Sequence, residues 1–86
     1  MVYGQQRTDD AIRAYRRVLE IDHYHIEALN DLAWILAEHG DAETRKEADA
    51  LATRGLEVQP TNAHLRDTRG VIRWRLGRTA ESRADL

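Results

Sequence analysis

The sequence of 86 residues matches itself when it is shifted by 37 positions. Residues 17–21 then fall on residues 54–58, and residues 32–35 fall on residues 69–72. Each segment carries apolar residues three and four positions apart, which is the spacing of one face of an α-helix. A self-match at such a period is typical of proteins built from repeated helical units. The sequence therefore predicts an all-α protein in which two kinds of amphipathic helix alternate.

Residues that start and stop helices predict where these helices lie. Thr44 and Glu47 form a capping box, which predicts a helix start. Gly40 and Gly77 follow apolar runs, where a left-handed residue usually ends a helix, and Pro60 forbids a helix from continuing. Residues 1–6 are expected to be the stub of a preceding helix. The sequence thus predicts five helices, at residues 9–21, 26–38, 43–58, 63–76 and 79–86.

Small residues at fixed places in the repeat resemble the pattern of the tetratricopeptide repeat (TPR) family. The residues that carry the resemblance are Ala33 and Gly70 in one helix type, Ala11 and Ala48 in the other, Gly40 and Gly77 at the turn, and Pro60 at the end. The usual period of that family is about 34 residues. An insertion between Gly40 and Ala48 explains the longer spacing in this chain.

The resemblance implies a single TPR-like domain over residues 1–86, a right-handed superhelix of helical hairpins. It divides into a partial repeat (1–25), a full repeat with an insertion (26–62) and a truncated repeat (63–86). His23 replaces the first closing proline, and the first repeat lacks its front helix. That lack is expected to leave Ile12, Tyr15 and Val18 partly uncovered, so we expect self-association as a homodimer.

The resemblance also implies a function as a scaffold that binds a peptide or helix of a partner protein. In this family the front helices line a concave groove. The ligand-contacting positions correspond here to Glu27, Asn30, Trp34, Glu38, His64, Asp67, Val71, Trp74 and Arg75. Trp34 is a large aromatic residue among polar neighbours, so it either packs on an adjacent helix or anchors a ligand. The carboxylate clamp of the chaperone-tail-binding members is absent, which favours a ligand with apolar anchors over an acidic tail.

Three arginines, Arg66, Arg69 and Arg73, fall on one face of the helix expected at residues 63–76. They are either paired with carboxylates such as Glu81 and Asp85 or open for a partner. An open stripe could also bind the phosphates of a nucleic acid. Residues 1–60 hold 7 basic and 12 acidic side chains, whereas residues 61–86 hold 6 and 3. The acidic majority argues against nucleic acid, and the asymmetry permits head-to-tail stacking of copies.

Signals for catalysis or for bound cofactors are scarce. The chain has no cysteine, and His23 and His25 lie at a predicted turn without further metal ligands nearby. There is no phosphate-binding loop, and Ser82 has no neighbour that would activate it. We therefore expect no enzyme activity, no metal and no cofactor. Without a signal peptide or a membrane-spanning segment, the default expectation is a cytoplasmic protein.

Overall fold

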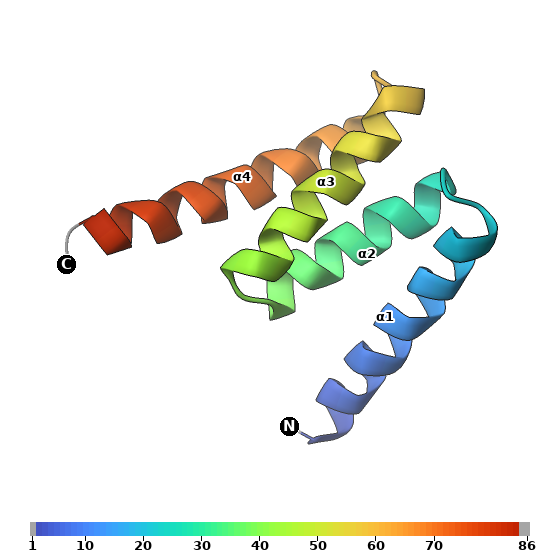
Figure 1. Ribbon diagram of the computed structural model, residues 1–86, viewed down its shortest axis with the longest axis horizontal. Coiled ribbons are helices and arrows are strands. Elements are labelled where there is room, and N and C mark those ends of the chain that lie inside the picture. Colours follow the sequence, from blue (N-terminus) through green and yellow to red (C-terminus); the bar gives the residue numbers. More distant parts are fainter. Residues whose placement is uncertain (1, 85–86) are drawn as a thin grey trace.

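Four α-helices joined by short turns make up the computed structural model, which describes the backbone of residues 2–84 and the side chains of residues 7–78. The helices are α1 (Val2–Ile21), α2 (Ile26–His39), α3 (Ala42–Val58) and α4 (Ala63–Ala84). The described backbone contains no strand, so the all-α prediction is confirmed. Successive helices run in opposite directions, so α2 and α4 point the same way (Figure 1).

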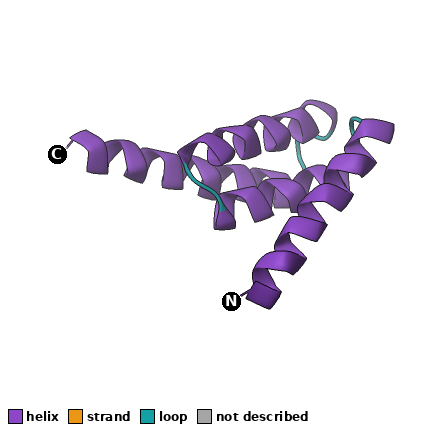
Figure 2. Ribbon diagram, turned by 60° about the horizontal axis from the view of Figure 1, so that its bottom comes forward, coloured by secondary structure: helices purple, strands orange, loops and turns teal. Residues whose placement is uncertain are grey.

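Helix α2 lies at the centre of the arrangement. It packs against α1, α3 and α4, and α3 also packs against α4. Helix α1 diverges from the other three helices toward its N-terminal end, and α4 extends beyond them at the opposite end (Figure 2). The chain therefore has its core around α2 and two helix ends that project from it.

The core consists of leucine, isoleucine and alanine side chains. Its largest fully buried members are Leu29, Leu32, Leu65 and Ile72. Ala33 is completely buried. A Cβ added at Gly55 of α3 would lie 2.7 Å from Leu65 Cδ1 of α4. Small residues therefore let neighbouring helices approach closely around α2.

The start of α3 differs from the prediction. The N-cap is Asp41, whose carboxylate accepts a hydrogen bond from the Thr44 backbone N–H at 3.0 Å. This bond lowers the pKa of Asp41. The Thr44 hydroxyl donates to the Asp41 carbonyl, so Thr44 lies inside the first turn and does not begin the helix. In the predicted capping box, the Glu47 carboxylate would accept a hydrogen bond from the Thr44 N–H. The Asp41 carboxylate accepts that hydrogen bond instead, so the helix starts earlier.

The predicted count of five helices is wrong, because residues 63–84 form one continuous helix. Gly77 lies inside α4, and Gly40 has an extended backbone with φ −107° and ψ −178°. No described residue has a positive φ, so neither glycine is left-handed. After Leu76 the only apolar residues up to the end of α4 are Ala80 and Ala84. A chain turning back at Gly77 would bury little apolar surface, which explains why the helix continues.

The predicted start of the first helix at residue 9 is wrong, and the remaining predicted boundaries are close to those observed. Pro60 follows the end of α3 at Val58, as expected. Helix α1 begins at Val2, so the residues expected to be a separate stub belong to it, whereas Met1 and residues 85–86 lie outside the described part.

Candidate binding face on helices α2 and α4

Polar contacts at two levels join α2 to α4. The Thr68 hydroxyl donates a hydrogen bond to Asn30 Oδ1 at 2.8 Å. Two turns further along both helices, the Arg75 guanidinium donates to Glu38 Oε1 at 2.7 Å and to the Ala37 carbonyl at 3.3 Å. Thr68 is buried, and both Glu38 and Arg75 are about 30% exposed. These contacts hold the two parallel helices in a fixed register.

Trp34 lies on the open side of α2, between Asn30 and Glu38 in the sequence. Its side chain is 44% exposed. Trp34 follows Leu32 by two positions, which places the two side chains about 160° apart around the helix. Leu32 is buried and faces α1 and α3, because it lines a cleft together with Leu51 of α3. Trp34 therefore points away from α3, and it is not enclosed by neighbouring helices.

Trp74 is the corresponding aromatic residue on α4, and it is 60% exposed. It follows Leu65 by nine positions, or about 180° around the helix. Leu65 touches Gly55 of α3, so Trp74 also points away from α3. The Arg78 guanidinium carbon lies 4.9 Å from the centre of its ring. Because Arg75 contacts Glu38, the two tryptophans are offset along the helices by only about 5 Å.

Each tryptophan has a carboxylate seven residues before it, Glu27 for Trp34 and Asp67 for Trp74. Seven residues are close to two helical turns, so each carboxylate shares the face of its tryptophan. Both carboxylates are exposed, and neither takes part in an ion pair or hydrogen bond within residues 7–78. The Arg78 cation at the Trp74 ring offsets only one of these two carboxylates, so the net charge of these groups is negative.

The nine residues predicted as ligand contacts therefore fall into two groups. Asn30, Glu38 and Arg75 join α2 to α4. The others are exposed or half-buried at the surface of these two helices: Glu27, Trp34, His64, Asp67, Val71 and Trp74. We refer to Glu27, Trp34, Asp67 and Trp74 as the tryptophan face. Thr68, which donates to Asn30, was not among the predicted contacts.

The arginine stripe lies on the side of α4 that faces α3. Arg73 Nε lies 3.1 Å from Asp49 Oδ1 of α3. Arg66 is exposed and Arg69 is half-buried, and neither has an ion pair or hydrogen bond among the described residues. The side chains of the partners suggested from the sequence, Glu81 and Asp85, lie outside the described part. The pairing of Arg73 was missed because its partner comes from a different helix.

Two polar contacts join α1 to its neighbours. The Tyr15 hydroxyl donates to Asp31 Oδ2 of α2 at 3.1 Å, and this bond, with burial as the second cause, raises the pKa of Tyr15. Arg16 binds Glu47 of α3 through two hydrogen bonds of 2.5 and 3.2 Å, which raise the pKa of Arg16. Helices α1, α2 and α3 border an open cleft of about 380 Å³ between α1 and α3.

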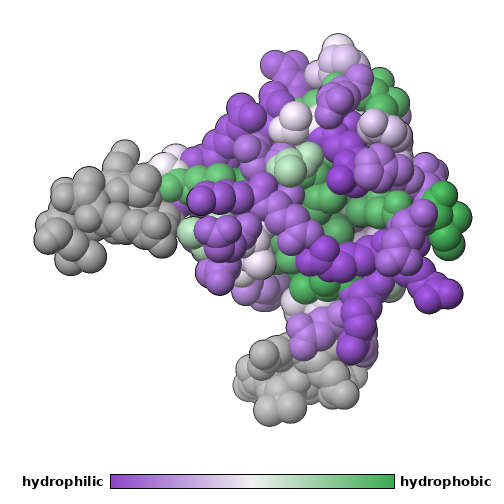
Figure 3. Space-filling view, in the orientation of Figure 1, coloured by the Kyte–Doolittle hydropathy of each residue, from purple (hydrophilic) through white to green (hydrophobic). Residues whose placement is uncertain are grey.

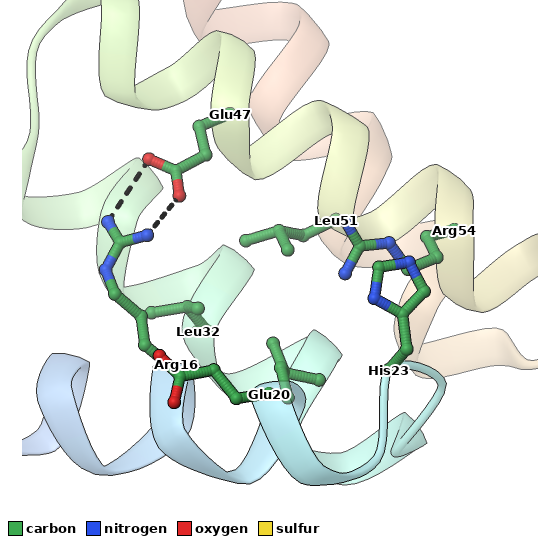
Figure 4. Close-up of a pocket in the computed structure, with 8 residues that line it drawn as sticks. Arg16, Glu20, His23, Leu32, Glu47, Leu51 and Arg54 are labelled. Atoms are coloured by element: carbon green, nitrogen blue, oxygen red, sulfur yellow. Dashed lines mark hydrogen bonds and ion pairs between the residues drawn. The ribbon is translucent and has the colours of Figure 1, made fainter.

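This α1–α3 cleft was not foreseen from the sequence. The Arg16–Glu47 pair lies at one end of it, His23 and Arg54 lie at the other, and leucines form the floor between them (Figure 4). Hydrophobic surface gathers over α2 on this side of the molecule, between α1 and α3 (Figure 3). Helical periodicity does not reveal which outer helices are neighbours, so it could not have located the cleft.

His25 and His23 serve local structure in the turn between α1 and α2. His25 Nδ1 accepts a hydrogen bond from the Ala28 N–H at 3.1 Å and caps α2, and the His23 ring packs edge-on against Tyr24. Among the described residues, no group of three histidine or acidic side chains could hold a metal ion. None of the described helices is long and apolar enough to cross a membrane.

Comparisons of the chain with protein-family models, with curated proteins and with solved structures found no match.

Proposed function

We propose that this protein is a TPR-like interaction module that binds a segment of a partner protein on the tryptophan face. The observation that carries the proposal is the placement of Trp34 and Trp74, 44% and 60% exposed, on one side of the α2–α4 pair. Exposed aromatic side chains on neighbouring helices are unfavourable in water, and tryptophan is enriched among the residues that dominate binding energy. The role proposed for them is to anchor a ligand.

The packing order of the helices supports a TPR-like arrangement. In the proposed assignment α2 and α4 are front helices, and α1 and α3 are second helices. The contacts of α2 with both α3 and α4 agree with hairpins that stack front helix on front helix. The polar contacts between α2 and α4 would then fix the floor of a groove before any ligand binds, which reduces the entropy lost on binding.

The charge of the tryptophan face specifies the ligand further. Glu27 and Asp67 are exposed carboxylates without ion-pair partners in the described part, and each lies two helical turns from a tryptophan. A complementary ligand combines apolar anchors with basic side chains about 10 Å away, a spacing of seven residues in a helix. We therefore propose a basic, amphipathic partner segment, either extended or helical.

A displayed library of random peptides tests this proposal. Peptides selected on the wild-type protein are expected to pair aromatic or aliphatic residues with lysine or arginine. Trp34→Ala and Trp74→Ala should each weaken their binding by about 2 kcal/mol, or roughly 30-fold. Because both side chains are substantially exposed, the variants are expected to keep the helical circular dichroism spectrum. Binding is measured by isothermal titration calorimetry.

Tyr24→Ala is the matched control, because Tyr24 is 46% exposed but lies in the turn between α1 and α2. It should leave the affinity unchanged. Selected peptides that bind both tryptophan variants as tightly as the wild type would rule out this face as the site. Loss of the helical spectrum in both variants would instead place the tryptophans in the core.

The two alternative functions receive less support. For nucleic acid, Arg66 and Arg69 are open in the described part, but Arg73 is paired with Asp49 and the net charge of the chain is −2. Self-association would use the exposed parts of Ile12, Tyr15 and Val18. These side chains are partly buried because they pack against the core, so only part of their apolar surface is open to a second copy. Sedimentation at high micromolar concentration would detect a homodimer formed through this surface.

A further inference from the structure

The α1–α3 cleft combines an apolar floor with a cation that has no partner among residues 7–78. Leu19, Leu32 and Leu51 line it, and all three are at least 93% buried. Arg54 lines the same cleft and is half-buried. No hydrogen bond or ion pair joins Arg54 to any residue in the described part of the chain. A partly desolvated guanidinium beside apolar surface is a favourable site for an anion that also carries an apolar group.

The carboxylates of the cleft do not neutralise Arg54. Glu47 binds Arg16 in a two-bond contact at the opposite end. Glu20 comes from α1, and its carboxylate points toward the Arg16 end (Figure 4). Only the imidazole of His23 shares the end occupied by Arg54, and it can donate a further hydrogen bond. The cleft is therefore polarised: the Arg16 end holds one cation and two carboxylates, and the Arg54 end is cationic.

The shape of the cleft limits what can occupy it. Its volume of about 380 Å³ lies in the range of sites for small molecules. The Arg16–Glu47 pair crosses one end, and the turn that carries His23 bounds the other (Figure 4). A polypeptide passing lengthwise would have to displace both ends. A compact ligand that terminates inside the cleft fits without such a change.

From these features we propose that the α1–α3 cleft binds a small carboxylic acid with a short apolar body. The carboxylate pairs with Arg54 and accepts a hydrogen bond from His23, and the apolar body covers the leucine floor. Such a site lies on the opposite side of α2 from the tryptophan face. It is independent of the proposed partner binding, and either proposal can fail without the other.

A titration with 4-phenylbutyrate, followed by amide nuclear magnetic resonance shifts, tests the site. Saturable shifts are expected at Leu19, Leu51 and Arg54. The alcohol 4-phenylbutanol has the same apolar body without the charge and should bind at least about tenfold more weakly. The amine 4-phenylbutylamine should give no saturable shifts at these residues.

Arg54→Gln should weaken 4-phenylbutyrate binding about tenfold, because it removes the charge and keeps most of the aliphatic stem. The control is Arg66→Gln, which removes an exposed arginine of α4 that lies outside the cleft and has no ion pair within residues 7–78; it should leave binding unchanged. Equal binding of acid and alcohol, no effect of Arg54→Gln, or no saturable shifts would each overturn the proposal. Tighter binding of the peptide acetyl-Gly-Leu-Asp-Gly-amide at the same residues would also overturn it, in favour of a polypeptide ligand.

Discussion

Two glycines inside helices have opposite surroundings, so the same substitution should have opposite effects. Gly55 of α3 is buried, and an added Cβ would lie 2.7 Å from Leu65 Cδ1 and 3.1 Å from Leu65 Cδ2. Gly70 of α4 is exposed, and a Cβ there would meet no atom within 4 Å outside the helix's own backbone. Alanine is favoured over glycine by roughly 0.5–1 kcal/mol within a helix. Only at Gly55 does a steric cost oppose this gain.

Gly70→Ala is therefore expected to raise the free energy of unfolding by about 0.5–1 kcal/mol. For Gly55→Ala, the Leu65 side chain is 0% exposed, so its methyl groups cannot swing into solvent. Overpacking of this kind costs about 1–3 kcal/mol, which leaves a net destabilisation of up to about 2 kcal/mol. The two variants should differ by about 1–3 kcal/mol, and urea denaturation resolves such a difference.

The outcome at Gly70 also distinguishes the observed helix from the predicted hairpin. A second helix at residues 79–86, folded back as the TPR resemblance predicts, would cover Gly70 as α3 covers α2. Gly70→Ala and the larger Gly70→Gln would then destabilise the protein. Destabilisation by 2 kcal/mol or more in Gly70→Gln would refute the continuous α4 and the reasoning built on it. Gly77→Ala is a second test of the same question. It should raise the free energy of unfolding if α4 is continuous and lower it if the chain turns at this residue.

Two further substitutions test single contacts. Tyr15→Phe removes the hydrogen bond to Asp31 and should cost about 1 kcal/mol at pH 7, measured by urea denaturation. The pKa of Tyr15 is raised in the folded state, so this stabilisation is present below pH about 10 and is lost as pH rises above that value; a difference between wild type and Tyr15→Phe that stays constant up to pH 11 would contradict it. Arg69→Ala should change the free energy of unfolding by less than about 1 kcal/mol, because no carboxylate within residues 7–78 is left without its partner. A loss of roughly 3 kcal/mol or more would indicate a buried ion pair.

Local signals in the sequence predicted the extent of α2 and the end of α3, because helix periodicity and proline act over a few residues. The end of α3 before Pro60 and the burial of Ala33 follow from such signals. The repeat pattern places Gly70 at the position of Ala33, but Ala33 is buried and Gly70 is exposed. A small residue is buried only if another helix covers it. Whether residues 79–84 turn back depends on the apolar surface they would bury, and a glycine at position 77 does not decide it.

Contacts between distant residues were beyond the sequence alone. The pairs Arg16–Glu47 and Arg73–Asp49 join different helices, and many arginines and acidic residues could have formed them. The exposure of Trp34 was left open, because a helical wheel places the residue relative to its own helix but not relative to neighbours. The tryptophan face was therefore predicted as a set of positions, whereas the polar contacts beneath it came from the structure.

The two proposed sites differ in how strongly the helices that form them are attached to each other. Arg16 and Glu47 are 46% and 38% exposed, and an exposed pair of this kind contributes about 0–1 kcal/mol. Apart from this pair, α1 is attached to the rest of the molecule through α2, so little fixes its distance from α3. The α2–α4 pair is joined by the buried Thr68 contact and by Arg75 bound to Glu38. A ligand of the α1–α3 cleft can therefore change the distance between α1 and α3 at a small cost in free energy. A ligand of the tryptophan face must instead fit the distance between α2 and α4 that these contacts fix.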